Sequence, residues 1–290
     1  MLTANEHYRS VFGCKMYKAS ISFAKSCPNR DGTKGTGGCI FCSAGGSGEF
    51  SAARDKTITR QIDEAISLVE RKAGPDAGYI AYFQSFTNTY CSPDELALAL
   101  DEAMAHPRIK ALSIATRPDC LPDKILEVIS EKSSEMPVYV ELGLQTSNDQ
   151  TAKLINRCYE TKDYDDAVRR LKEIGVNVIT HVIFGLPGET EEKMMESVRH
   201  CVKAGTDGIK FTCLYVLKDT ALEKMWRAGE FEVLGEEEYF DIVEKAIELL
   251  PPDTVVHRLT GDGPKKLLLA PMWTADKRGV INYINRRFAK

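Results

Sequence analysis

Short segments rich in Ile, Val, Tyr and Phe alternate with segments of helical periodicity along most of this chain. The expected strands are 17–23, 78–84, 111–116, 138–144, 176–184 and 208–214. The expected helices are 58–72, 93–105, 122–132, 163–174, 190–204 and 221–228. Such alternation predicts parallel strands joined by right-handed crossovers, in an open doubly wound sheet or a complete or partial (β/α) barrel. In both folds, functional side chains gather at the carboxyl ends of the strands.

The last sixty residues continue this pattern less regularly. A helix is expected over 236–250, where Pro251 and Pro252 end it. A strand over 254–259, a loop with the sequence GDGPKK and a final helix over 275–288 follow. Because no low-complexity linker separates these segments, we expect a core in residues 1–230 and a C-terminal extension, residues 231–290, packed on it.

Composition excludes several classes of protein. With 38 Lys+Arg, 42 Asp+Glu and 43% hydrophobic residues, the chain is of ordinary globular type, neither strongly basic, disordered nor fibrous. There is no run of about 20 apolar residues and no apolar segment typical of a signal peptide, so we expect a cytoplasmic protein without membrane contact. Nine cysteines in such a chain favour thiols or thiolate ligands over disulfides.

Positive charge gathers at both ends of the chain. Residues 1–60 hold nine Lys/Arg against four Asp/Glu, and residues 251–290 hold eight against three. One interpretation is a set of solvated helix faces. The other is that two basic ends meet at one mouth of the fold and receive a phosphate-bearing substrate. The C-terminal part also combines basic and aromatic side chains that suit phosphates and stacked bases: His257, Arg258, Lys265, Lys266, Trp273, Lys277, Arg278, Arg286 and Arg287.

The densest chemical signal is a cluster of three cysteines, Cys27, Cys39 and Cys42, directly after the first expected strand. A structural zinc site would need four protein ligands, and no fourth Cys or His with paired spacing lies nearby. A redox pair made of Cys39 and Cys42 would leave Cys27 unused and lacks a thioredoxin context. A [4Fe-4S] cluster held by three thiolates would leave one iron open for catalysis.

These cysteines, with Phe41 just before the last one, resemble the cluster loop of the radical S-adenosylmethionine (SAM) superfamily. That loop usually has three residues between its first two cysteines, whereas this chain has eleven. The long spacing and the words SCPNRDGT, GGCIFC, ELGLQT, FGLPGET and HRLTGDGP resemble the Elongator-like subgroup of the YhcC/YtqA type. The resemblance implies an α/β fold, a partial (β/α)6 barrel with a C-terminal strand and helix extension. It also implies that the cluster binds SAM at its open iron and cleaves it to a 5'-deoxyadenosyl radical, which removes a substrate hydrogen.

Later motifs lie at the ends of the expected strands. Where the superfamily often has glycines after its second strand, this chain has the sequence QSFT, and Gln84, Ser85 and Thr87 are candidate cofactor contacts. Ordinary strand-end packing is the alternative for these three residues. Arg117, at the end of the third strand, is a candidate for a carboxylate or phosphate, and a structural ion pair with Asp119 is the alternative.

The fourth expected strand ends in ELGLQT, whose period-two spacing puts Glu141, Gly143 and Gln145 on one face. A carboxylate and an amide inside a barrel need partners. The resemblance implies that Gln145 and Arg157 contact the ribose and the methionine carboxylate of SAM, and that Glu141 holds the methionine amino group or a neighbouring cation. A non-functional salt bridge between Glu141 and Arg157 is the alternative.

The fifth expected strand carries THVIFGLPGET. Gly185 and Gly188 give the backbone freedom to approach a planar ring, and the resemblance places the adenine of SAM there. His181 occupies a position where relatives often carry an Asp directed at the ribose. A histidine satisfied within the core is the alternative.

The resemblance further implies a substrate and partners. It suggests tRNA, with conversion of a 5-carboxymethylaminomethyl to a 5-aminomethyl side chain on the wobble uridine, and an electron donor such as flavodoxin or ferredoxin. Acetyl transfer is not expected, because nothing in the sequence resembles an acetyltransferase domain. Two alternatives stay open: a radical-SAM enzyme for a small metabolite or peptide, and a non-catalytic metal-binding or partner-binding protein. The sequence does not set the oligomeric state.

Overall fold

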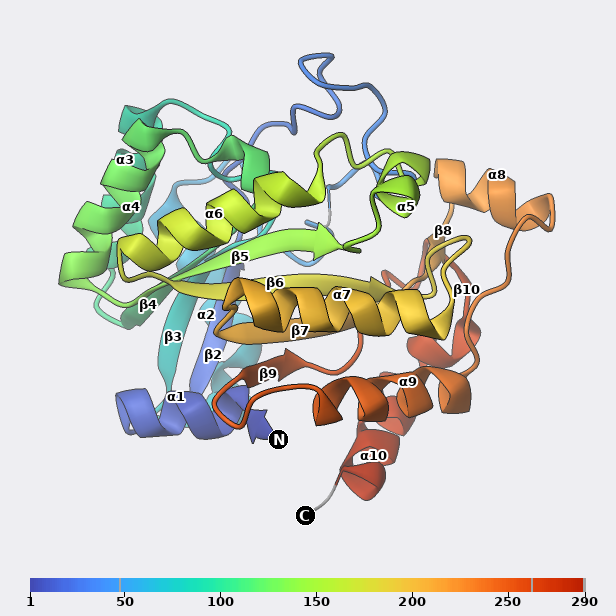
Figure 1. Ribbon diagram of the computed structural model, residues 1–290. Coiled ribbons are helices and arrows are strands. Elements are labelled where there is room, and N and C mark those ends of the chain that lie inside the picture. The colour runs from blue at the N-terminus through green and yellow to red at the C-terminus, as the bar shows by residue number, and fades with distance from the viewer. Residues whose placement is uncertain (47, 262, 289–290) are drawn as a thin grey trace.

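The computed structural model describes residues 1–46, 48–261 and 263–288, and an all-parallel sheet of eight strands forms its centre. The strand order is β1-β9-β7-β6-β5-β4-β3-β2, and the sheet curls into a half-barrel (Figure 1). A short antiparallel ribbon of β8 and β10 is separate from it. The strands are β1 (Leu2–Thr3), β2 (Met16–Ile21), β3 (Gly78–Phe83), β4 (Ile109–Thr116), β5 (Val138–Gln145), β6 (Asn177–Phe184), β7 (Gly208–Cys213), β8 (Val216–Leu217), β9 (Val255–Arg258) and β10 (Leu268–Ala270).

Helices connect the strands, and most of them cover the outer face of the sheet (Figure 1). They are α1 (Ala4–Phe12), α2 (Ile58–Ala73), α3 (Pro93–Met104), α4 (Asp123–Glu135), α5 (Asp149–Leu154), α6 (Thr161–Glu173), α7 (Glu191–Ala204), α8 (Ala221–Arg227), α9 (Glu236–Glu248) and α10 (Lys277–Arg287). Local sequence fixes several helix starts. Ser92 and Glu95 form a capping box at α3, with Pro93 in the first turn. None of the helices in the described ranges is long and apolar enough to cross a bilayer.

The structure confirms the predicted partial barrel and adds two strands to it. All six predicted strands and all eight predicted helices are present, with ends that differ by a few residues. The predicted strand at 254–259 is β9, which extends the sheet by pairing with β7. β1 was not predicted. It pairs Leu2 with Val255 and Thr3 with Val256, so the first strand of the chain forms the sheet edge next to β9. Asp262 of the predicted GDGPKK loop lies outside the described residues.

The strands separate an apolar outer face from a polar inner face. In β5, Val140 and Leu142 pack into the core shared with the helices, while Glu141, Gly143 and Gln145 line the inside of the half-barrel. The predicted common face of these three residues is therefore confirmed.

A second, smaller apolar cluster closes the half-barrel at the amino ends of the strands. Tyr8 of α1 packs there with Met16, Ile80 and Tyr139. Because this end is closed by α1, the interior is accessible from the carboxyl ends of the strands, where the predicted site residues lie.

Inside the half-barrel, the buried carboxylate of Glu141 joins β5 to four other strands. It forms ion pairs with Lys18 of β2 and Lys210 of β7. His181 Nε2 of β6 lies 2.7 Å from Glu141 Oε2, and Ser113 of β4 donates its hydroxyl to Oε1 at 2.6 Å. We call these five residues the Glu141 network. It cross-links five strands of the sheet through one side chain, because each partner comes from a different strand.

The Glu141 network also sets the charges of its members. Burial alone would raise the pKa of Glu141, but the charges of Lys18 and Lys210 and the hydrogen bond with His181 hold it well below its ordinary value. Burial and the charge of Lys210 lower the pKa of His181 to about 4, against the opposing effect of Glu141. At neutral pH the interior therefore contains an ionised Glu141 and a neutral His181.

We expect Glu141→Gln to lower the free energy of unfolding by about 3 kcal/mol or more, because the buried Lys210 and the partly buried Lys18 lose their only charged partner in the network. Urea denaturation monitored by circular dichroism measures this change. Ser113→Ala is the matched control, since it removes one hydrogen bond to the same carboxylate and should cost about 1 kcal/mol. Equal losses in the two variants would contradict the central role of the charge.

A second prediction concerns pH. The unfolded chain protonates His181 near its ordinary pKa of 6.5, whereas the folded chain does so only near 4. The contribution of a neutral His181 to stability is therefore complete above pH 6.5 and is lost as the pH falls toward 4. In His181→Gln we expect a shallower decline of the unfolding free energy over this interval. An unchanged slope in urea titrations at several pH values would refute the assignment.

Candidate functional site

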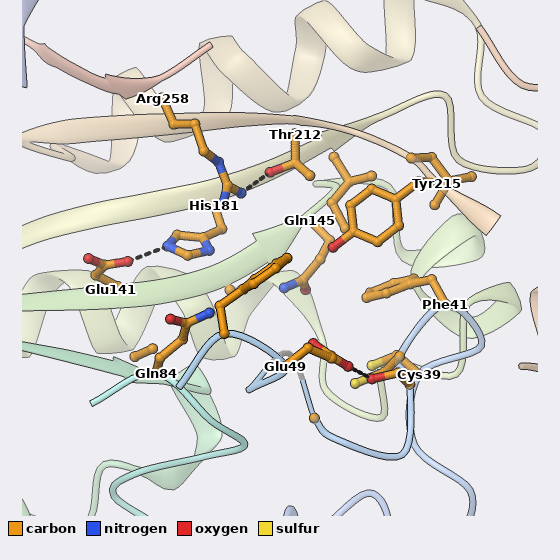
Figure 2. A pocket seen from close by; sticks show the side chains of 18 of the residues that line it. Cys39, Phe41, Glu49, Gln84, Glu141, Gln145, His181, Thr212, Tyr215 and Arg258 are labelled. Carbon is orange, nitrogen blue, oxygen red and sulfur yellow. Dashed lines mark hydrogen bonds and ion pairs between the residues drawn. The ribbon is translucent and has the colours of Figure 1, made fainter. Parts of the chain in front are cut away.

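A cavity of about 530 Å³ opens at the carboxyl ends of the strands, a size typical of small-molecule sites. Figure 2 shows side chains from the cysteine loop on one side of it and from β6, β7 and β9 on the other. We define the cysteine loop as the described residues between 27 and 50. The end of β3, the ends of β4 and β5, and α10 complete the wall.

All three cysteines of the motif, Cys27, Cys39 and Cys42, line this cavity as free thiols. Arg117 Nη1 lies 3.8 Å from Cys27 Sγ, and Asn29 Nδ2 lies 3.6 Å from Cys39 Sγ. Burial, together with the neighbouring Cys42, raises the pKa of Cys39 to about 12. A thiolate at this position therefore needs a positive partner, as a metal centre provides.

The donor set fits an iron–sulfur cluster. Among the described residues, no three Cys, His, Asp or Glu side chains lie close enough together to hold a single metal ion. A cluster distributes its thiolate ligands over separate iron atoms, so three thiols around one cavity match it without a fourth protein ligand. A closed zinc site would need that fourth ligand.

The long spacing between the first two cysteines folds back on the segment after α5. Asn29 is buried and donates to the carbonyl of Asn156, whose own side chain donates to the Gly38 carbonyl at 2.8 Å. Arg30 donates to the Cys42 carbonyl at 3.1 Å. Side-chain hydrogen bonds therefore order the eleven residues that distinguish this loop from the usual one.

After β3, two of the three predicted contacts reach the cavity. Gln84 and Thr87 line it, whereas Ser85 does not and instead packs against Gly48, where its Cβ would clash with any side chain. Phe86, which sequence reasoning missed, also lines the cavity and has a φ of 56°. Such a backbone conformation is strained for a bulky residue and is typical of functional sites.

The end of β5 presents Gln145 to the cavity in a fixed orientation. Its Oε1 accepts a hydrogen bond from the Tyr159 hydroxyl at 2.9 Å, and its φ is 62°. A side chain at Gly143 would meet the amide of Gln145 and displace it from this orientation. Tyr159 lines the cavity as well and was not predicted.

The two predicted arginines have different environments. Arg117 lines the cavity and forms a bidentate pair with Asp119, with both contacts at 2.9 Å, so the structural ion pair considered for it is present. Arg157 is fully buried and does not line the cavity. It donates to the Leu144 carbonyl at 2.8 Å and pairs with Asp149 at 3.1 Å, so the alternative of a Glu141–Arg157 salt bridge is wrong.

Gly185 also lies outside the cavity wall. A side chain there would contact Leu234 at 3.0 Å, so the loop before α9 covers this backbone. Leu234 is distant from Gly185 in the sequence, so the local motif around Gly185 did not reveal that this backbone is covered.

His181 and Glu141 lie at the inner end of the cavity, with Thr212 and Arg258 beside them (Figure 2). Arg258 donates a hydrogen bond to the Thr212 hydroxyl. Sequence reasoning missed Lys18 and Lys210, although a signal was available. Each is a lysine within an otherwise apolar strand, and a charged residue in such a strand usually faces a polar interior.

The two basic ends of the chain meet at this cavity. Arg30 comes from the first sixty residues, and Arg258 and Lys277 come from the last forty. Val280 and Ile284 of α10 add an apolar wall. This arrangement agrees with the interpretation that the two basic ends of the chain meet at one side of the fold.

Comparison with known families agrees with the fold. Residues 22–201 match the Radical SAM superfamily, and residues 206–290 match the Radical SAM C-terminal domain. These matches divide the chain between 201 and 206, and our boundary at residue 230 stays a prediction. The archaeal Methanocaldococcus infernus Elp3 with an N-terminal deletion has a TM-score of 0.70 at 19% identity, over 95% of this chain and 64% of that one.

Two protein sequences show the relationship further. A tRNA uridine(34) acetyltransferase of Methanocaldococcus infernus is 29% identical over 178 residues, which is 60% of this chain but only 33% of that protein. The uncharacterized protein YtqA of Bacillus subtilis is 40% identical over 284 residues, covering 98% of this chain and 88% of YtqA. With this similarity and a family match over more than half of its length, the chain belongs to the radical SAM superfamily of enzymes.

Proposed function

We propose that Cys27, Cys39 and Cys42 hold a [4Fe-4S] cluster and that SAM binds beside it in the cavity. The observation that carries this proposal is that three free thiols share one cavity with polar side chains from the ends of several strands. When bound, the cluster and SAM together supply a radical that takes one hydrogen atom from a substrate.

The residues of the chain bind and orient these groups. Arg117 and Asn29 hold two of the sulfurs through the contacts described above. Gln145, fixed by Tyr159, offers an oriented amide to a ribose hydroxyl. The apolar side chains of α10 exclude water from the cavity, which protects a reactive radical from side reactions.

For the substrate, we propose tRNA and the side chain of its wobble uridine, converted from 5-carboxymethylaminomethyl to 5-aminomethyl. Loss of a hydrogen beside the nitrogen leaves a carbon radical, an electron-transfer protein takes up one electron and the N–H proton is released, and water hydrolyses the resulting imine to the amine and glyoxylate. The similarity to a tRNA uridine(34) acetyltransferase supports a uridine at this position. The basic residues Arg30, Arg258 and Lys277 at the cavity support a nucleic-acid substrate. A small electron-transfer protein such as flavodoxin or ferredoxin is the proposed reductant.

We expect Cys42→Ser, prepared and reconstituted with iron and sulfide without oxygen, to lose the roughly four irons per chain of a [4Fe-4S] centre. Its release of 5'-deoxyadenosine from SAM with dithionite should fall to background. Cys14→Ser is the matched control, because Cys14 is a partly exposed free thiol that does not line the cavity. If Cys42→Ser retained iron and SAM cleavage, this ligand set would be wrong.

The tRNA proposal is tested by nucleoside analysis. Total tRNA from cells that lack the protein should accumulate 5-carboxymethylaminomethyluridine and lose the 5-aminomethyl derivatives. Restoring the wild-type chain should reverse both changes, and restoring Cys42→Ser should reverse neither. Mass spectrometry of digested tRNA measures the two nucleosides, and identical profiles with and without the protein would exclude this substrate.

A further inference from the structure

The inner end of the cavity is rich in cations. Arg258, the last residue of β9, borders it, and Lys18 and Lys210 lie behind it in the Glu141 network. Within the described part of the chain, Glu141 is the only carboxylate that forms an ion pair with either lysine, and no carboxylate forms one with Arg258. His181 is neutral and burial lowers the pKa of Lys210 well below its ordinary value, but Lys18 and Arg258 still outnumber the single negative charge of Glu141.

Arg258 presents its guanidinium to the cavity rather than to the protein. Its side-chain hydrogen bond within the described residues goes to Thr212 Oγ1, a neutral partner that leaves other N–H groups available. Of the other arginines at the cavity, Arg117 has Asp119 as an acidic partner, whereas Arg30 donates to the Cys42 and Ser43 carbonyls. An arginine at a cavity wall with no acidic partner among the described residues is suited to an anionic ligand.

The strand register places Arg258 at the cavity wall beside the Glu141 network, although the residue as a whole is exposed. Arg258 pairs with Lys210, which pairs with His181, and β7 continues beyond Lys210 to Cys213. Figure 2 shows Arg258 and Thr212 across the cavity from Cys39, the side on which the cofactor would bind. The terminal carboxylate of a substituent can reach Arg258 through the cavity without the rest of a polynucleotide entering it.

We infer that Arg258 and Thr212 form a subsite for a carboxylate at the end of a substrate side chain, in a cavity end whose positive charge disfavours amine-terminated side chains. The inference rests on the proposed function only for the identity of the molecule that bears the carboxylate. The guanidinium donates charge-assisted hydrogen bonds to the carboxylate oxygens. Arg258 is thereby a specificity-determining residue that selects acidic over basic side chains.

The test compares two nucleosides, one with and one without the terminal carboxymethyl group. We expect the reconstituted protein with SAM to bind the nucleoside 5-carboxymethylaminomethyluridine at least tenfold more tightly than 5-aminomethyluridine in isothermal titration calorimetry. This preference should disappear in Arg258→Gln and persist in part in Arg258→Lys. Arg278→Gln is the matched control, because Arg278 is exposed on α10, does not line the cavity, and should keep the wild-type preference.

Several outcomes would overturn the subsite. One is that the wild-type protein shows no preference for the acid. Another is that Arg258→Gln keeps the preference while its iron content and circular dichroism match those of the wild type. Uridine 5'-monophosphate binding with the same dependence on Arg258 would assign the site to phosphate instead. If Arg258→Gln failed to fold, the wild-type comparison of acid with amine would still decide.

A further ligand pair separates this inference from the proposed function. N-Benzylglycine and its primary amide differ in the same carboxylate but carry no uridine. Arg258-dependent preference for the acid of this pair, together with an unchanged tRNA nucleoside profile, would retain the subsite and reject the tRNA substrate. A changed tRNA profile with no acid preference in either pair would reject the subsite and retain the tRNA substrate.

Discussion

Five strands of the half-barrel are joined at one carboxylate, that of Glu141. Because Lys18, Lys210, His181 and Ser113 all contact it, one side chain both cross-links these strands and sets the charge of the interior. A complete small barrel fills its interior with apolar side chains, whereas this open one keeps a polar interior that receives a ligand. The arrangement places fixed charges where a cofactor and substrate bind, before either is present.

The sequence predicted the fold well where a pattern is local and periodic. Alternating strands and helices, the capping box at Ser92 and the common face of Glu141 and Gln145 all follow from spacing of a few residues. β1 has two residues and therefore no period, and its partner Val255 is far away in the sequence. The parallel pairing that adds β9 and β1 to the sheet depends on chain topology that no local pattern encodes.

The same difference between local and long-range information applies to the candidate site. Three cysteines close together in the sequence line one cavity, because a short loop keeps them near each other, and their role as cluster ligands stays a prediction. Whether a strand-end residue reaches that cavity depends instead on what packs over it. Tertiary neighbours bury Ser85 and cover Gly185, and the bonds of Arg157 to its own loop keep it out of the cavity. Lys18 and Lys210 were visible as charges within apolar strands, yet only the register shows that both meet Glu141.

The pairing of β1 with β9 also governs the order in which this molecule is completed. Val255, the partner of the first strand, is translated after all the earlier strands of the eight-stranded sheet, and α10, which walls the cavity, follows later still. The thiol-bearing loop is thus translated long before the segments that shelter it. Enclosure of the cysteines therefore waits for the translation of α10, and until then the nascent polypeptide exposes them to solvent.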